Sequence, residues 1–425
     1  MRATAPLWSS GYRPFFLLGV AYGIALMLAW AWALVMPDAP VWPAFAGRTW
    51  HAREMLFGFS SAIIAGVVLT ALPSWAGIDE FHGARLIQLI VLWGTGRVAM
   101  WVAAMDTTQW IACLDLLFLP ALIMTVTPAL LPARRKIFLW LLPVLGAFWA
   151  AQIATHVTDP VAVTAALRTA LHASVYAIIL LYVLVGGLFT PIFTGNALQR
   201  SGRGSQAPFR PALETAVVAL VIALAACDLA RAPEWLTGAA ALACALVHGW
   251  RVLRWRGWRA FDDGVALLMN LGFFWLLVAF ALRAAAAFSD AIPHDAWLHA
   301  FTAGSLGMMM IGLMTRVVLR HTGRPMVVVP AIVLAAVLIC AATVLRLAAG
   351  TLVGAYGPDA SIGPAWSRLA ALLTGNGSVA AAALCWALAL ALWYGRFAPM
   401  LLAPSLPRQA GPARPAPTDG RSARE

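Results

Sequence analysis

The chain has 425 residues, of which 62% are hydrophobic and only 11% are charged, and its formal net charge is +12. Its mean hydropathy of +0.83 is too high for a soluble protein, and its apolar residues come in runs of about twenty. This composition excludes an ordinary soluble domain. It predicts an all-α polytopic membrane protein, because lipid offers the backbone of a spanning segment no other hydrogen-bond partner.

The apolar runs, separated by charges and prolines, predict about twelve transmembrane helices. In chain order these spans are 14–36, 55–73, 84–104, 110–131, 136–156, 171–195, 212–230, 235–250, 263–288, 298–315, 328–349 and 377–396.

The basic residues predict the orientation of these spans. If both termini are cytoplasmic, most Arg and Lys residues fall in the inner segments, as the positive-inside rule requires. The positive net charge therefore has a topological explanation. Since no soluble segment combines basic and aromatic residues into a stacking surface, membrane lipid is the expected partner and nucleic acid is not.

Two regions divide the chain at residue 402. Residues 1–402 form the predicted twelve-helix transmembrane domain. Residues 403–425 are rich in proline and arginine and hold too little apolar surface to fold, so they predict a disordered cytoplasmic tail.

Two charges lie within the predicted membrane depth on neighbouring spans. Arg97 precedes the outer end of span 84–104, and Asp115 follows the outer start of span 110–131. At 1.5 Å per residue both lie roughly 8 to 10 Å below the surface, so they can pair across the hairpin. We expect a salt bridge that joins the two helices, and a role in proton delivery remains the alternative.

The second span combines small residues with a polar start. Gly58, Ala62 and Gly66 recur every four residues, which predicts close contact with a neighbouring helix. His51, Arg53 and Glu54 place an imidazole, a guanidinium and a carboxylate at the outer mouth of that helix.

Five of the eight histidines fall on the outer side of the predicted membrane. An ionisable or metal-binding side chain at such a depth is costly unless it has a partner, so the asymmetry predicts a site. No Cys-x-x-Cys-His motif is present, which excludes covalent attachment of a c-type haem. The five histidines are His51, His156, His172, His294 and His299.

Several segments resemble the NnrS family, in order along the chain. The most specific is the last, Met314-Thr315-Arg316 followed by His321-Thr322-Gly323-Arg324-Pro325. The similar segments are 50–59, 69–75, 96–100, 115–120, 134–135, 171–173, 190–198, 298–300, 314–316 and 321–325. The resemblance implies a bacterial inner-membrane protein with twelve spans that contains haem and copper and acts in denitrification and in resistance to nitric oxide.

The chain departs from the family pattern at three positions. Arg53 replaces the second histidine of the family's His-x-His-Glu-Met motif, Asn270 replaces a histidine of the ninth span, and Leu188 replaces the arginine of a Gly-Gly-Arg motif. Arginine and leucine do not ligate metals, and asparagine is a poor ligand for iron or copper. The departures predict either that one metal of the family is missing or that the chain is a divergent paralogue.

The remaining histidines suffice for a haem b. Such a haem needs one or two imidazoles at matched depth, apolar contact for the ring and cations for the propionates. His51 and His299 begin spans two and ten from the outer face and are followed by small residues. We expect these two as axial ligands, with Arg53 or Arg48 paired to a propionate.

A second metal site is predicted on the same face. His172 and Tyr176 lie one turn apart on the sixth span, and His156 ends the fifth span at a similar depth. Together they predict a second metal, copper in the light of the resemblance. The alternative is that both are interfacial histidines.

The opposite face carries a basic group after span ten. Arg316, His321 and Arg324 predict either a positive-inside anchor or a site for an anion or a haem propionate.

Three classes of function follow. The first is a haem protein that binds, senses or detoxifies nitric oxide, the second is a permease for a small solute or metal, and the third is an assembly factor that carries haem or copper. Glu54 is the only outer candidate for general acid catalysis, and the sequence leaves open whether the protein is an enzyme and which electron donor it uses.

Overall fold

The computed structural model describes residues 5–36, 47–103, 109–132, 136–157, 164–355 and 376–407. Within these ranges every regular element is helical, and eleven helices are long and apolar enough to cross a membrane. Helix α4 (Ala84–Ala103) is of similar length but less apolar, because it carries two arginines and a glutamine. It completes the twelve predicted spans, so the expected all-α polytopic fold is confirmed.

Six further spans are each a single helix, and the other five are joined from two or three helical pieces. The single helices are α1 (Tyr12–Val35), α9 (Pro211–Leu229), α10 (Glu234–Trp255), α11 (Gly264–Ala286), α14 (Pro330–Ala355) and α16 (Asn376–Leu402). Two of the joined spans have two pieces: η4 (Gln109–Leu117) with α5 (Phe118–Leu130), and η5 (Lys136–Trp140) with α6 (Leu141–Val157). The other three have three pieces. They are α2 (Arg48–Arg53) with η3 (Glu54–Ser60) and α3 (Ser61–Ala76); α7 (Ala165–Leu181) with η6 (Tyr182–Gly186) and α8 (Gly187–Arg200); and α12 (Ala296–His299) with η8 (Ala300–Leu306) and α13 (Gly307–His321).

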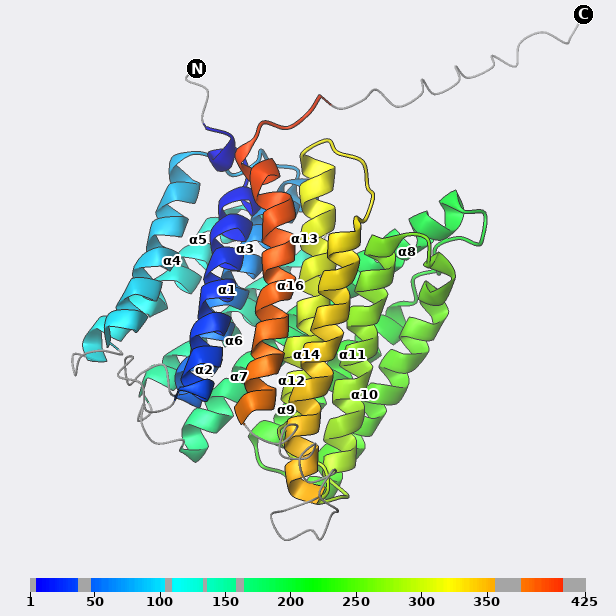
Figure 1. Cartoon of the computed structure of the whole chain (residues 1–425). Helices are drawn as coiled ribbons and strands as arrows, with labels where there is room; N and C mark the ends of the chain where they lie inside the picture. The colour runs from blue at the N-terminus through cyan, green and yellow to red at the C-terminus, as the bar shows by residue number, and fades with distance from the viewer. Residues whose placement is uncertain are drawn as a thin grey trace, which may run out of the picture.

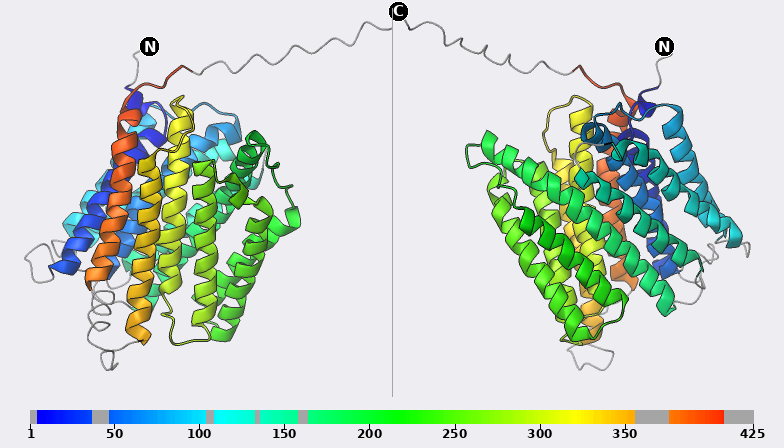
Figure 2. Two further views of the ribbon diagram at one scale, coloured as in Figure 1. Left: turned by 45° about the vertical axis from the view of Figure 1, so that its right-hand side comes forward. Right: turned by 180° about the vertical axis from the view of Figure 1, so that it is seen from behind.

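Two of the joined spans form the centre of the bundle. In their most apolar stretch, 83% of the residues of Arg48–Ala76 and 78% of those of Ala296–His321 are buried, against 22% for Pro211–Leu229. Helix α4 and the pair α9 and α10 lie on opposite flanks, with α13 between them (Figures 1 and 2). His51 and His299 therefore belong to the two most buried spans.

Helix α1 packs closely on α3, as the small residues predict. A Cβ atom added at Gly66 would lie 2.6 Å from the ring of Phe16, so only glycine permits this approach of the two helices. The contact places α1 beside the histidine-bearing span.

Three π-helical segments interrupt the described spans, two of them in the two central spans and the third in the span Ala165–Arg200. The segment η3 follows His51 within one turn, η8 follows His299 directly, and η6 divides α7 from α8. Such wide turns are frequently found at functional sites, where they displace side chains from the regular helical register. Sequence periodicity did not predict them.

Arg13 joins the first and last described helices. Its Nη1 donates to the carbonyl oxygens of Leu401 and Ala403, each at 2.7 Å, and its Nη2 donates to Ser405 Oγ at 2.9 Å. Residues 403–407, the start of the predicted tail, are thus ordered, while 408–425 lie outside the described residues. Both described ends of the chain meet at one end of the bundle (Figure 1), which we call the terminal end; the opposite end is the distal end.

Candidate functional site

His51 lies in the short helix α2 at the distal end of the bundle. Its imidazole stacks on Trp30 of α1, with ring centroids 4.6 Å apart and the planes inclined by 15°. Its Nδ1 is buried and has no hydrogen-bond partner among the described residues. A buried ring nitrogen without a hydrogen-bond partner costs free energy, so this position suits a histidine that binds a ligand.

His299 occupies the equivalent place on the other central span, at the end of α12. Its Nδ1 is also buried without a partner in the described part of the chain. The two histidines interact electrostatically with each other, and both interact with Arg346 of α14. The two residues that the sequence predicted as haem ligands therefore lie within electrostatic range of each other.

Cations surround this pair of histidines. Arg346 interacts electrostatically with Arg48 and with Asp295, which precedes α12. Arg48 was predicted as a propionate partner, and Arg346 was not, although an arginine within an apolar run is itself an unusual signal. Two imidazoles whose Nδ1 atoms have no partner among the described residues, together with two guanidinium groups, fit the iron and the two propionates of a haem.

Arg53, the other predicted propionate partner, is engaged elsewhere. Residues two apart on a helix face different ways, and Arg53 Nη2 lies 2.7 Å from His156 Nδ1. Arg53 is therefore part of a buried ionic network rather than of the His51 and His299 pair.

The centre of that network is Arg97. Its Nη1 donates to Glu54 Oε2 at 2.7 Å, and its Nη2 donates to Asp115 Oδ1, which is the predicted ion pair. Asp115 Oδ2 in turn accepts from His156 Nε2 at 3.3 Å and from Gln152 Nε2 at 2.8 Å. We call Glu54, Arg97, Asp115 and His156 the Arg97 chain.

The Arg97 chain is shielded from solvent and from the membrane. Glu54 is fully buried, and Arg97 and Asp115 expose no more than 5% of their surface. The hydroxyl of Tyr22 donates to Glu54 and itself accepts from Trp101 Nε1 at 2.9 Å. Because arginine does not give up its proton, Arg97 cannot pass protons between Asp115 and Glu54, which favours the structural interpretation over proton delivery.

His156 has no free nitrogen in this arrangement. Its Nδ1 contacts Arg53 and its Nε2 contacts Asp115. A metal needs a ring nitrogen with an available lone pair. The expected second metal at His156 and His172 is therefore not supported, and no group of three or more His, Cys, Asp or Glu side chains lies close enough to hold a metal anywhere in the described ranges.

His172 belongs to a second ionic chain. Its Nδ1 lies 3.0 Å from Asp228 Oδ2, and Arg283 donates to Asp228 Oδ1 at 2.7 Å and to Glu234 Oε2 at 3.0 Å. We call His172, Asp228, Arg283 and Glu234 the Arg283 chain. The neighbouring Tyr176 stacks on Trp297, with centroids 5.2 Å apart, rather than facing a metal.

The basic group at the terminal end has mostly structural partners. Arg316 lies over the ring of Phe193 with a separation of 3.4 Å, and the His321 ring packs against Tyr12 at 5.5 Å. The contacts of Arg316 and His321 fit the anchor. The Nη1 of Arg324 is buried and lacks a hydrogen-bond partner among the described residues, which fits the predicted anion site.

Asn270, one of the departures from the family pattern, is part of a helix contact. Its Nδ2 donates to Thr194 Oγ1 of α8 and to the carbonyl of Ala266, each at 2.8 Å. The amide thus joins α11 to α8, and it supplies no ligand there.

Comparison with known proteins confirms the resemblance. A family model described as NnrS protein matches residues 6–405, which includes all the described spans. No curated protein matches the chain. The extent of the match shows that this multi-pass membrane protein belongs to the NnrS family.

Proposed function

We propose that this protein holds a b-type haem between His51 and His299 in a bacterial inner membrane and that it acts in the binding or detoxification of nitric oxide. The observation that carries the proposal is the pair of buried Nδ1 atoms of His51 and His299, which have no hydrogen-bond partner among the described residues and lie on the two most buried spans. When bound, the haem would supply an iron that binds a diatomic gas.

The surrounding residues have distinct parts in this proposal. Trp30 fixes the plane of the His51 ring by stacking, so that imidazole is oriented before any ligand binds. Arg346 interacts electrostatically with both histidines, and Arg48 interacts electrostatically with Arg346. These two arginines would therefore pair with the propionates. The ring nitrogens without a hydrogen-bond partner in the described part of the chain and the two arginines thus lie in one region at the distal end of the bundle.

Copper is a less supported expectation. Within the described residues the best-placed remaining imidazole is that of His172, and its only polar contact there is with Asp228. We therefore propose haem as the principal cofactor, and the copper content is measured in the same experiment.

The proposal is tested on the full chain purified from membranes. A pyridine haemochromogen assay and metal analysis on one sample should give haem b together with iron. His51→Ala and His299→Ala should each lose most of the Soret absorbance. His82→Ala, which changes an exposed histidine near the terminal end, is the matched control and should retain it.

Other outcomes identify the alternative functions. Absence of haem from the unmodified protein would overturn the proposal and favour a permease. Rapid transfer of the haem to an apo-protein acceptor would favour the assembly factor. Equal haem content in all three variants would show that the haem is held elsewhere.

A further inference from the structure

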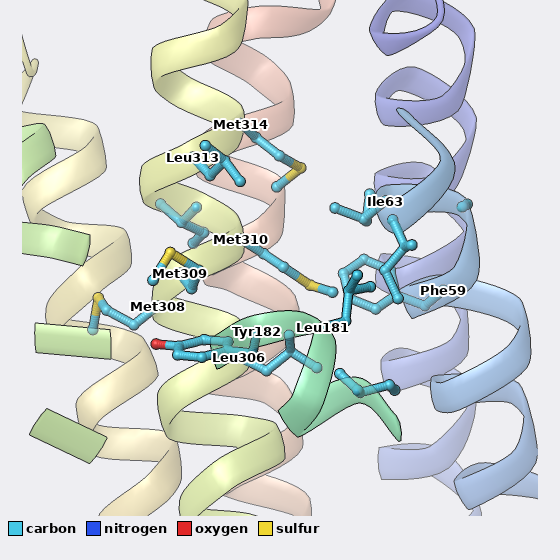
Figure 3. Packing of buried hydrophobic residues seen from close by; sticks show 14 of the residues in the cluster. Phe59, Ile63, Leu181, Tyr182, Leu306, Met308, Met309, Met310, Leu313 and Met314 are labelled. Atoms are coloured by element: carbon cyan, nitrogen blue, oxygen red, sulfur yellow. The ribbon is translucent and has the colours of Figure 1, made fainter. Parts of the chain in front are cut away.

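A cavity of about 70 Å³ lies at mid-depth in the bundle. One water molecule needs roughly 10–15 Å³ of such space, so this cavity exceeds a single water several times. Figure 3 shows the packing around it, with the side chains of Met310 and Met314 of α13 directed toward Phe59 and Ile63. The lining residues are Ile63, Ile64, Val67, Val68, Ile178, Leu181, Tyr182, Val185, Gly186, Leu306, Met309, Met310, Leu313 and Met314.

The local structure explains why this space is not filled. Tyr182, Val185 and Gly186 come from the π-helical segment η6, and Leu306 ends η8. Wide π-helical turns displace side chains from the ridges that would otherwise interlock. Gly186 leaves out a side chain at the wall, where a Cβ atom would lie 3.3 Å from Met309 Cε.

The chemistry of the walls restricts the occupant. All the surface that faces the cavity is apolar, and the hydroxyl of Tyr182 points away from it (Figure 3). Water and ions find no hydrogen-bond partner in such a space, so it stays dry. Methionine thioethers are polarisable and flexible, which suits contact with a small polarisable guest.

The size of the space restricts the occupant. Its innermost walls are buried, with Val68 1% and Met314 0% exposed. The space is only partly enclosed, so its small volume, and not a closed wall, limits the occupant to a few heavy atoms. A neutral diatomic gas diffuses through protein and lipid and fits the volume.

We propose that this cavity binds a small apolar gas, and in this protein nitric oxide, a choice of gas that rests on the proposed function. The walls α3 and α13 continue the same two spans that carry His51 and His299 at the distal end. Leu306 is seven positions from His299 in the sequence, or about 10 Å along a helix. The cavity would hold gas at this distance from the histidine pair.

The test uses xenon as the probe and the methyl groups of methionine as reporters. Full-length, haem-free protein in lipid nanodiscs, labelled with ¹³C in its methionine methyls, is titrated with xenon. The signals of Met309, Met310 and Met314 should shift and saturate. Met124 is 74% exposed and should shift only in proportion to xenon pressure.

Three variants complete the design. Ile64→Phe fills the cavity and should weaken xenon binding at least tenfold, and Val68→Ile adds one methylene and should weaken it about threefold, with less risk to folding. Ile222→Phe makes the same substitution as the first on a surface that faces outward, 48% exposed, and should bind xenon as the unmodified chain does.

The outcomes separate this proposal from that for haem. Shifts at the three methionines that never saturate, or xenon binding that Val68→Ile and Ile64→Phe leave unchanged, would overturn the gas site. A lipid chain occupying the cavity would give the same unsaturable result. Because the titration needs no haem, loss of the haem proposal leaves this test intact, and the haemochromogen assay is equally independent of xenon.

Discussion

The Arg97 chain and the Arg283 chain have the same order of partners in different surroundings. In each, a histidine contacts one oxygen of an aspartate, an arginine contacts the other, and the same arginine reaches a glutamate through its Nη1. Glu54, at the end of the first chain, is fully buried, whereas the side chain of Glu234, at the end of the second, is 53% exposed.

This difference separates two uses of one ionic motif. A buried ion pair depends on every partner, because a charge left alone cannot be solvated, whereas an exposed carboxylate is solvated by water when its partner is lost. The Arg97 chain should therefore be essential to the packing of its helices. The Arg283 chain should tolerate change and leaves His172 accessible, with 20% of its side chain exposed.

Removing the arginine at the centre of each ionic chain should give the largest loss in the free energy of unfolding. Arg97→Leu leaves Glu54 and Asp115 buried without a counter-charge and should destabilise the protein by about 3–5 kcal/mol. Arg283→Leu should cost less, about 1–3 kcal/mol, because Glu234 remains hydrated and the largely buried Asp228 keeps its contact with His172. Thermal unfolding of both variants in detergent, followed by circular dichroism, measures the contrast, and equal losses would contradict it.

Replacing the glutamate at the end of each ionic chain, Glu54 or Glu234, by glutamine should give the next largest loss of stability. Glu54→Gln removes the charge that faces Arg97 and should cost about 1.5–3 kcal/mol, since hydrogen bonds to charged groups are stronger than neutral ones. Glu234→Gln should cost less than about 1 kcal/mol. Repeating the unfolding at high salt sharpens the comparison, because salt should weaken only the exposed pair.

A single methyl group should disturb the Arg97 chain by crowding. A Cβ atom at Gly58 would lie 2.8 Å from Arg97 Nη1 and 2.9 Å from Glu54 Oε2, so Gly58→Ala should cost about 1–3 kcal/mol. Gly94→Ala in α4 meets no atom within 4 Å and should be neutral or slightly stabilising. A higher unfolding temperature for Gly58→Ala than for Gly94→Ala would contradict the packing.

The smallest disturbance is a chemical label on the histidines of the folded protein. Diethyl pyrocarbonate should modify His172 several times faster than His156, whose two ring nitrogens are engaged and whose side chain is only 8% exposed. Mass spectrometry of the labelled peptides gives the two rates. Faster modification of His156 than of His172 would contradict the assignment of His156 as the more buried of the two histidines.

The sequence predicted the fold well because lipid imposes length and apolarity on every span. All twelve predicted spans correspond to helices, and the Arg97–Asp115 pair followed from matched depth on two consecutive helices. The same reasoning works wherever partners are near in the chain.

The remaining site residues depend on how each helix is rotated about its axis, which hydropathy does not report. His156 was expected to face His172, yet it faces Asp115 and Arg53. Arg346 of α14 comes from a span far from His51 in the sequence, so only the packed bundle brings these groups together. Arg283 pairs with residues of the two preceding spans, α9 and α10, but hydropathy does not show which faces of those helices meet. The π-helical segments, which widen the core near the cavity, leave no simple periodic signature.

The link from Arg13 to α16 has a consequence for biogenesis. Its carbonyl partners lie 388 and 390 positions further along the chain. A ribosome that is inserting this protein releases α1 into the bilayer long before those carbonyls exist. The guanidinium group must remain near the lipid headgroups for most of translation, and the arrival of α16 then closes the bundle.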